Sequence, residues 1–245
     1  MSQPHWNQSY DDLLSRAIRQ FWNTRENQSK DQKTRGSVDA GKRGAVTGGK
    51  QMDGFARLMR QIAADAGIPK EDIFTNSNEL PGYFRPTKKW DLLVVKDKQL
   101  LACVEFKSQV GPSFGNNYNN RVEEALGDAV DVHAAYKNKA FGNQQPFWAG
   151  YLMLVEKVPE STSSVDVKEP HFRILENFRN ESYLGRYKIL CHRLMEERHY
   201  DSTCLIWSEN SEDTPKFGMG DDGLSFKRFA YSFKGFLLGH LGGEE

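Results

Sequence analysis

The order of apolar and polar positions divides the first half of the chain into two helices and two strands. Apolar side chains recur at spacings of three and four over residues 8–23 and again over 52–62, which predicts a helix in each range. Residues 90–95 and 100–106 are short apolar runs separated by the polar stretch 96–99, which predicts a β-hairpin.

The second half of the chain continues the alternation of helix and strand. An apolar stripe over 122–136 predicts a helix, and the almost wholly apolar run 147–155 predicts a strand that is buried on both faces. We expect a loop over the glycine-, serine- and asparagine-rich residues 108–120 and a polar surface loop over 156–169. A helix near 182–198, a strand near 202–208 and a last helix near 224–239 complete the pattern. One side of the last helix is apolar and consists of Phe226, Phe229, Phe233, Phe236 and Leu237. The simplest interpretation is that these are core residues, and a dimer interface is the alternative.

These elements predict an α/β fold in one domain over residues 1–245, with a catalytic core at about 51–155. The N-terminal helix and the segment 170–241 are additions to that core. The composition agrees, because 38 % of the 245 residues are hydrophobic and 12 % are aromatic, enough for a core and too many for a disordered chain. The 33 basic and 33 acidic residues balance, so any nucleic-acid contact depends on local charge.

The cysteines and the N-terminus indicate the cellular setting. Cys103, Cys191 and Cys204 form no CxxC pair and are odd in number, so we expect them reduced and outside a disulfide framework. Residues 1–10 lack the apolar stretch of a signal peptide, and no apolar run is long enough to span a membrane. We therefore expect a cytoplasmic protein without a membrane partner.

Three charged residues of the predicted hairpin are candidates for chemistry. Glu105 and Lys107 are two residues apart near the end of an apolar strand, so their side chains point to the same face. Asp91 opens the preceding strand, and an antiparallel pair brings the start of one strand beside the end of the next. We therefore expect Asp91, Glu105 and Lys107 to cluster at one edge of the sheet.

A cluster of two carboxylates and a lysine suits phosphodiester hydrolysis. Asp91, Glu105 and the main-chain carbonyl of Phe106 offer oxygen ligands of the kind that Mg²⁺ prefers. Lys107 could orient or help to deprotonate a water and stabilise the transition state. The alternative is an ordinary ion pair on a solvated strand, but two charges are costly at the end of an apolar strand unless they serve a purpose.

The spacing of these residues resembles a known signature. Asp91, thirteen intervening residues and then Glu105-Phe106-Lys107 resemble the motif of the PD-(D/E)xK nucleases, although Trp90 stands where that family often has proline. The segment 105–117, the chain length and the layout are similar to the XhoI family of type II restriction endonucleases. The resemblance implies a PD-(D/E)xK core with a mixed central sheet flanked by helices. It also implies a Mg²⁺-dependent homodimer that cuts both strands of CTCGAG, leaving 5′ overhangs and 5′-phosphates. A cognate DNA methyltransferase would act on the same site without forming a stable complex.

Two segments are candidates for contact with double-stranded DNA. Residues 24–50 hold seven basic and three acidic residues, five glycines and almost no apolar residue, and we expect this segment to order on DNA. The second candidate is the loop after the motif, because asparagine and glutamine suit adenine edges and arginine suits guanine. The candidate residues are Arg35, Lys42, Arg43, Lys50, Gln109, Asn116, Asn117, Asn119, Asn120 and Arg121. A merely solvated loop is the alternative for 24–50.

Other features leave two further functions open. Residues 44–50 fit GxxxxGK, but Gln51 replaces the Ser or Thr of a P-loop and no apolar strand precedes it, which argues against ATP binding. Asp53 is more consistent with the first turn of a helix than with a metal site. A repair or recombination nuclease that recognises DNA structure is one alternative function. A DNA-binding module without catalysis is another, although all three residues of the motif are present.

Overall fold

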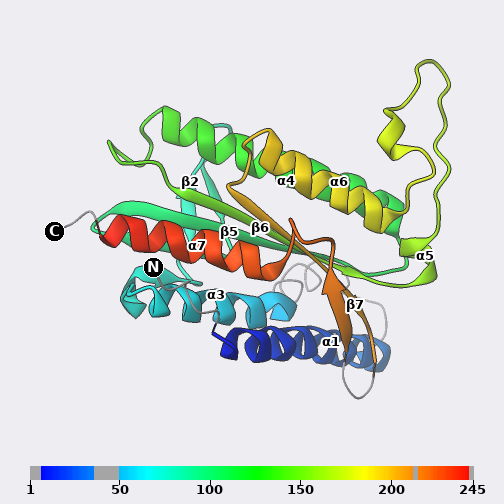
Figure 1. Cartoon of the computed structure of the whole chain (residues 1–245), viewed down its shortest axis with the longest axis horizontal. Coiled ribbons are helices and arrows are strands. Elements are labelled where there is room, and N and C mark those ends of the chain that lie inside the picture. Colours follow the sequence, from blue (N-terminus) through cyan, green and yellow to red (C-terminus); the bar gives the residue numbers. More distant parts are fainter. Residues whose placement is uncertain (1–6, 36–49, 212–214, 243–245) are drawn as a thin grey trace.

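A mixed six-stranded sheet forms the centre of the molecule. The structure is a computed structural model that describes residues 7–35, 50–211 and 215–242 (Figure 1). The strand order is β1-β4-β5-β6-β7-β8, where β5, β6 and β7 are parallel and the other pairs antiparallel. The strands are β1 (Ile73–Phe74), β4 (Leu92–Lys96), β5 (Gln99–Gln109), β6 (Trp148–Glu156), β7 (Ser202–Glu209) and β8 (Lys216–Met219). The expected mixed sheet is thus confirmed.

Helices cover both faces of this sheet (Figure 1). One face packs against α1 (Ser9–Arg35), α3 (Asp53–Asp65) and α7 (Phe226–Leu241). The other packs against α4 (Phe114–Lys137) and α6 (Tyr183–Glu196). The short helix α5 (Pro159–Thr162) and three 3-10 helices, Lys50–Met52, Lys70–Asp72 and Glu176–Phe178, lie in the connections. In each layer the alternate residues of the strands meet the apolar stripe of a helix, so two hydrophobic cores share the sheet.

Most of the predicted elements are present. β6 is buried along Trp148–Val155, as expected for a strand with a parallel neighbour on each side. The β4–β5 turn is tight, with positive φ at Asp97 and Lys98, a conformation that matches the twist of a hairpin. Phe226, Phe229 and Phe233 of α7 are buried, so the phenylalanine side is core.

One predicted helix boundary and one predicted loop are wrong in part. The predicted first helix ends near residue 23, but α1 continues to Arg35, because charged and amide residues with good helix propensity extend it without an apolar face. The expected loop 108–120 is only four residues long, since β5 runs to Gln109 and α4 begins at Phe114. Phe114 is buried and Tyr118 packs on Tyr187 with ring centroids 5.1 Å apart, so packing overrides the low helix propensity of the asparagines.

A second sheet, of two strands, was not predicted from the sequence. It is the hairpin of β2 (Glu79–Pro81) and β3 (Thr87–Lys89), which precedes β4. Its base is tied to the chain by the backbone bond from the Trp90 N–H to the Asn78 carbonyl, 3.0 Å. Its tip is held because the amides of Tyr83 and Phe84 both donate to one carboxylate oxygen of Asp131, each at 2.8 Å. The hairpin is thereby fixed against α4.

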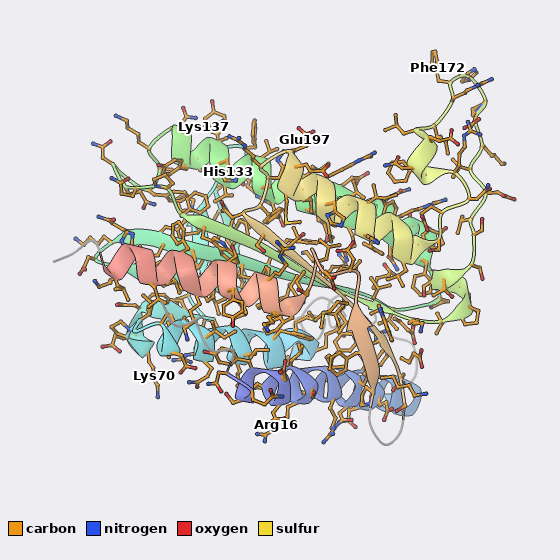
Figure 2. The ribbon with its side chains drawn as sticks, in the orientation of Figure 1. Arg16, Lys70, His133, Lys137, Phe172 and Glu197 are labelled. Atoms are coloured by element: carbon orange, nitrogen blue, oxygen red, sulfur yellow. The ribbon has the colours of Figure 1, made fainter. Side chains whose placement is uncertain are left out.

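Among the connections that the structure describes, a long one joins α5 to α6. It carries Phe172, whose side chain is 88 % exposed at the outer end of the segment (Figure 2). Among the described residues, no helix is both long and apolar enough to cross a membrane. Cys103, Cys191 and Cys204 are all buried free thiols, as expected from their spacing.

The packing of α1 on α3 depends on one glycine. A β-carbon at Gly54 would lie 2.8 Å from the Cα atom of Ala17, closer than side-chain atoms approach a backbone. The two helices can therefore come this close only because residue 54 has no side chain, and α1 seals the apolar face of α3.

We predict that Gly54→Ala lowers the free energy of unfolding by about 1–3 kcal/mol through overpacking. Urea denaturation measures the change. The matched control is Gly235→Ala in α7, where an added β-carbon meets nothing within 4 Å. That control is expected to be neutral or stabilising, because alanine favours a helix. Equal stability of Gly54→Ala and wild type would show that α1 can shift without cost.

Candidate active site

Strand β5 places its two charged residues on the α4 side of the sheet. Glu105 and Lys107 alternate with Phe106, whose side chain packs into the core on the opposite face. Glu105 is 4 % exposed, while Lys107 lies closer to the surface. Glu105 is therefore a carboxylate within a largely apolar layer, where an ionised group requires compensation by opposite charge.

Asp91 continues the β4–β5 ladder with its side chain. The last paired residues are Leu92 and Val104, and beyond them the N–H of Phe106 donates to Oδ2 of Asp91 over 2.7 Å. The Asp91 N–H donates in turn to the Val104 carbonyl over 3.2 Å. This double attachment sets Asp91 beside Glu105, so the expected meeting of Asp91, Glu105 and Lys107 at one sheet edge is observed.

Two lysines hold the carboxylate of Glu105. Lys107 Nζ is 2.7 Å from Oε1, and Lys88 Nζ is 2.9 Å from Oε2. Lys88 comes from β3, is largely buried and lies 4.8 Å from the centroid of the Trp90 ring. It is missing from the sequence prediction, and its sequence signal was its position in the basic pair Lys88-Lys89, which Trp90 separates from Asp91.

Helix α4 adds a row of acids that the sequence analysis also missed. Glu124, Asp128 and Asp131 follow one another at spacings of four and three, which places them on one face of the helix. Asp128 Oδ2 is 3.1 Å from Lys88 Nζ, and Glu124 Oε2 is 3.4 Å from Lys107 Nζ.

Arg85 completes the row of charges from the hairpin side. It binds Asp128 at 2.6 Å and Asp131 at 2.7 Å. Hydrogen bonds from Arg85 and from the amides of Tyr83 and Phe84 hold the pKa of Asp131 below its ordinary value despite some desolvation. The site is therefore a chain of alternating charges that joins β5, α4 and the β2–β3 hairpin.

The charges at this site shift the ionisation of two groups. Burial, and then the proximity of Glu105, raise the pKa of Asp91 from an ordinary 3.8 to about 7. Burial opposes the charge of Lys107, but Coulomb attraction and the hydrogen bond to Glu105 outweigh it, so the pKa of Lys107 is raised. Lys107 is therefore an ammonium at neutral pH, whereas the surroundings of Asp91 oppose its ionisation.

Comparison with known proteins shows the family. The family model of restriction endonuclease XhoI matches residues 31–218, a range that includes the whole site. The chain belongs to the XhoI restriction endonuclease family. It is thus a member of a family of site-specific endonucleases, and the resemblance seen in the sequence is confirmed.

Three curated relatives carry the name type II restriction enzyme. BstVI from Geobacillus stearothermophilus is 54 % identical over 70 % of this chain and 79 % of its own length. XhoI from Xanthomonas vasicola is 42 % identical over 76 % of this chain and 75 % of its own. AbrI from Azospirillum brasilense is 45 % identical over 72 % and 80 %. No solved structure matches the chain significantly.

The candidate DNA-contacting residues of this family member lie in different surroundings. Asn116, Asn119 and Asn120 are exposed in the first turns of α4, and Asn117 is half-buried. Arg121 follows them, pairs with Glu124 and reaches toward the carbonyl of Ser108 at 3.4 Å. This surface thus adjoins Lys107 through Glu124.

Gln109 and the basic segment are placed differently from expectation. Gln109 is 2 % exposed and accepts a hydrogen bond from the Tyr187 hydroxyl at 3.2 Å, so in this structure it is a core residue and cannot reach a base. Lys50 is exposed at the start of a 3-10 helix. Arg35 ends α1, while Lys42, Arg43 and the GxxxxGK glycines lie outside the described residues.

The end of the basic segment is tied to the site strand. Gln51 donates to the hydroxyl of Ser108 at 2.9 Å and accepts from Arg25 of α1 at 3.2 Å. Ser108 follows Lys107 in β5, so both sides of the segment are anchored beside the site. Asp53 lies in the first turn of α3, as expected, and is exposed.

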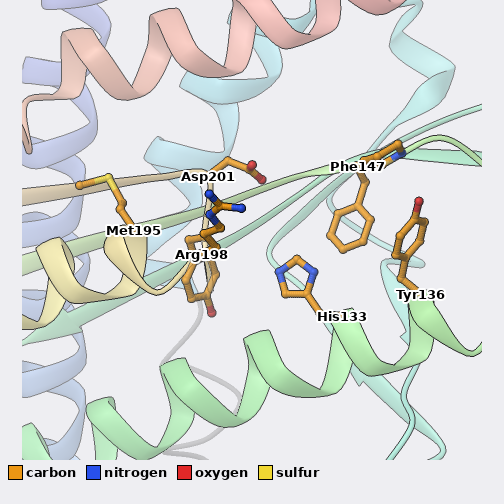
Figure 3. A pocket seen from close by; sticks show the side chains of 8 residues that line it. His133, Tyr136, Phe147, Met195, Arg198 and Asp201 are labelled. Carbon is orange, nitrogen blue, oxygen red and sulfur yellow. The ribbon is translucent and has the colours of Figure 1, made fainter.

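A separate pocket lies between the C-terminal parts of α4 and α6. It is lined by His133, Tyr136, Phe147, Met195 and Arg198, among others (Figure 3). None of the residues of the charge chain lines it. Within the described part of the chain, no three His, Cys, Asp or Glu side chains are grouped so that they could hold one metal ion.

The raised pKa of Asp91 predicts a pH dependence of stability without metal. The folded protein holds this proton more tightly than the unfolded chain, so the stability from the protonated form is lost as pH rises from about 4 to about 7. Asp91→Asn keeps an acceptor for the Phe106 N–H and carries no charge. We therefore expect the variant to be more stable than wild type in EDTA at pH 8, with a difference that narrows toward pH 5.

Urea denaturation in EDTA across this pH range measures the difference. Asp166→Asn, an exposed position in the segment between α5 and α6, is the matched control and should follow wild type at every pH. Parallel curves for Asp91→Asn and wild type would contradict the assigned environment of Asp91.

Proposed function

We propose that this member of the XhoI family hydrolyses double-stranded DNA at a six-base palindrome, in a Mg²⁺-dependent reaction that leaves 5′-phosphate ends. The observation that carries the proposal is the meeting of Asp91, Glu105 and Lys107 at the ends of β4 and β5. Resemblance to the family supplies CTCGAG, with 5′ overhangs, as the expected sequence.

The donor atoms at the cluster fit Mg²⁺. Asp91 and Glu105 supply carboxylates. The N–H and C=O groups of one strand residue point toward the same neighbouring strand. Because the N–H of Phe106 donates to Asp91, the carbonyl of Phe106 should also face Asp91. Two side-chain ligands suffice for Mg²⁺, which keeps several waters and phosphate oxygens. Burial, and then the charge of Glu105, raise the pKa of Asp91, and a bound divalent cation would stabilise its ionised form. When bound, Mg²⁺ would supply Lewis acidity toward the phosphate and toward water.

The protein residues then have distinct roles. Asp91 and Glu105 hold the cation, and Asp91 is positioned by the backbone of β5. Because Lys107 is charged, it suits orientation of a water and stabilisation of charge on the scissile phosphate better than proton abstraction. The protonated lysine thus favours the first of the two roles considered from the sequence.

We propose that the DNA lies across the N-terminal end of α4. The exposed Asn116, Asn119 and Asn120 can reach base edges, Asn117 and Arg121 are nearer the site, and Gln109 is withdrawn from the set. Lys50, Arg35, Lys42 and Arg43 of the basic segment are proposed to contact phosphates and to give binding its salt dependence.

The symmetry of a palindrome determines the assembly that we propose. Two identical chains related by a two-fold axis present one active site to each strand, so a homodimer is the simplest arrangement. The protein would act in the cytoplasm, where a cognate methyltransferase modifies the same sequence and makes no stable complex with it.

Digestion of a large sequenced DNA tests the proposal directly. We expect discrete fragments in Mg²⁺, none in EDTA, and ends that map to CTCGAG. Discrete ends at another sequence would keep the restriction enzyme and discard the inferred target. Random ends, or cuts confined to junctions and flaps, would favour a repair nuclease, and uncut DNA with retained binding would favour a binding module.

Removal of the charge at Glu105 or Lys107 tests the assigned residues. Glu105→Gln keeps the shape between the two lysines, whereas Glu105→Ala leaves both ammonium groups without their carboxylate. We expect Glu105→Gln and Lys107→Met to lower the cleavage rate by at least about a hundredfold. Specific DNA binding, measured by gel shift in Ca²⁺, should be largely retained, and an active Glu105→Gln enzyme would refute the assignment.

A further inference from the structure

The ammonium group of Lys88 lies between two carboxylates of different elements. Its Nζ atom is 2.9 Å from Glu105 Oε2 in β5 and 3.1 Å from Asp128 Oδ2 in α4. The side chain is 10 % exposed and covers the Trp90 ring. Its Nζ atom also lies 3.1 Å from the main-chain carbonyl of Lys89. Lys88 is therefore a largely buried cation with two carboxylates within reach, and a shift of its end group can exchange one carboxylate for the other without breaking the hairpin.

Both carboxylate oxygens of Glu105 are occupied by lysines. Lys107 Nζ is 2.7 Å from Oε1, and Lys88 takes Oε2. Asp91 is different, because one of its oxygens accepts from the Phe106 N–H, and Oδ1 has no partner among the residues described. A divalent cation bound by both Asp91 and Glu105 would lie close to two ammonium groups that contact the same carboxylate, and the movement of one lysine away from Glu105 would relieve that repulsion.

The surroundings identify Lys88 as the lysine that gives way. Its second acceptor, Asp128, is nearly buried and is fixed by Arg85, 2.6 Å from Oδ1, which leaves Oδ2 directed at Lys88. The second acceptor of Lys107 is Glu124, which is 40 % exposed, lies farther away at 3.4 Å and also pairs with Arg121. If a lysine moves from Glu105 to its second carboxylate, the movement is therefore shorter for Lys88 than for Lys107, and the new carboxylate is more buried and better fixed.

We propose that Lys88 is a resident counter-ion that neutralises Glu105 in the metal-free protein and yields it to the divalent cation by moving onto Asp128. Lys88 is thus a positioning residue for the metal site. It holds the carboxylate of Glu105 in place before metal binds, and it competes with metal for the same oxygen. The inference rests on the proposed metal site at Asp91 and Glu105.

Substitution of Lys88 separates this role from that of a structural ion pair. Lys88→Met removes the charge and keeps most of the volume. We expect it to bind Ca²⁺ or Mg²⁺ about three- to tenfold more tightly than wild type, because no ammonium competes for Glu105. It should also melt lower than wild type in EDTA and recover most of that loss in saturating Ca²⁺. Calorimetric titration without DNA and melting curves give the two readouts.

Two further variants serve as comparisons. Lys88→Arg retains the charge, so its melting temperature in EDTA and its affinity for Ca²⁺ or Mg²⁺ should both be close to those of wild type. Lys89→Met changes the exposed neighbour in the same strand and should match wild type in every measurement.

A double-mutant cycle tests the movement onto Asp128. Asp128→Asn still offers an oxygen to Arg85 but a poorer acceptor to Lys88, so Lys88 should remain on Glu105 and metal affinity should fall. In the Lys88→Met background the same change should have little effect. Equal effects in the two backgrounds would indicate general electrostatics and would overturn the exchange. If Asp128→Asn does not fold, the Lys88→Met affinity decides.

The failure of this inference differs from the failure of the proposed function. Wild-type protein that binds metal and cleaves DNA, while Lys88→Met has the same metal affinity and the same loss of melting temperature in EDTA and Ca²⁺, would overturn the role of Lys88 alone. Wild-type protein that neither binds a divalent cation nor cleaves DNA would overturn the proposed function, and this inference with it.

Discussion

The architecture around the site depends on the compensation of one buried carboxylate. Glu105 lies 4 % exposed in the layer between the sheet and α4, where an isolated charge would cost several kcal/mol. Lys107, in the same strand, supplies one positive charge beside the carboxylate. Lys88 supplies the other from the β2–β3 hairpin, which forms a sheet separate from the main one. This requirement accounts for the position of Lys88 in the hairpin and, through Asp128 and Glu124, for two of the acids on α4.

The same arrangement shows how the fold brings distant residues to one edge. β4 and β5 are a local hairpin, so Asp91 and Glu105 meet through the shortest possible connection. Helix α4 leaves the end of β5 and crosses back over it to reach β6, which carries Glu124 and Asp128 over the residues that precede the helix in the chain. The catalytic candidates and their electrostatic support therefore come from one continuous stretch of sequence, residues 79–131.

Much of this could be predicted from the sequence, for identifiable physical reasons. The period-two pattern fixes which β5 side chains share a face, and the turn length fixes which end of β4 is adjacent, so the meeting of Asp91 with Glu105 followed from geometry. Lys88 could not be found in this way, because its approach depends on the hairpin folding back onto α4, a contact without local periodicity. The asparagines after β5 suggested a loop, and Gln109 suggested a surface residue. Burial of Phe114 instead begins a helix, and the hydrogen bond from Tyr187 holds Gln109 in the core. Both contacts are tertiary, so the local sequence does not reveal them.

The three buried thiols have a consequence for observing this enzyme at work. Cys103 lies two residues before Glu105 in β5, Cys191 is in α6 and Cys204 is in β7, so each lies in a different element of the fold. Burial raises the pKa of all three, and a thiol reacts with alkylating agents only as an exposed thiolate. The rate at which each cysteine is alkylated therefore measures how often its own helix or strand opens to solvent. Because Cys103 lies in the same strand as Glu105, its labelling rate measures the local opening of that strand in the unaltered protein, with and without DNA.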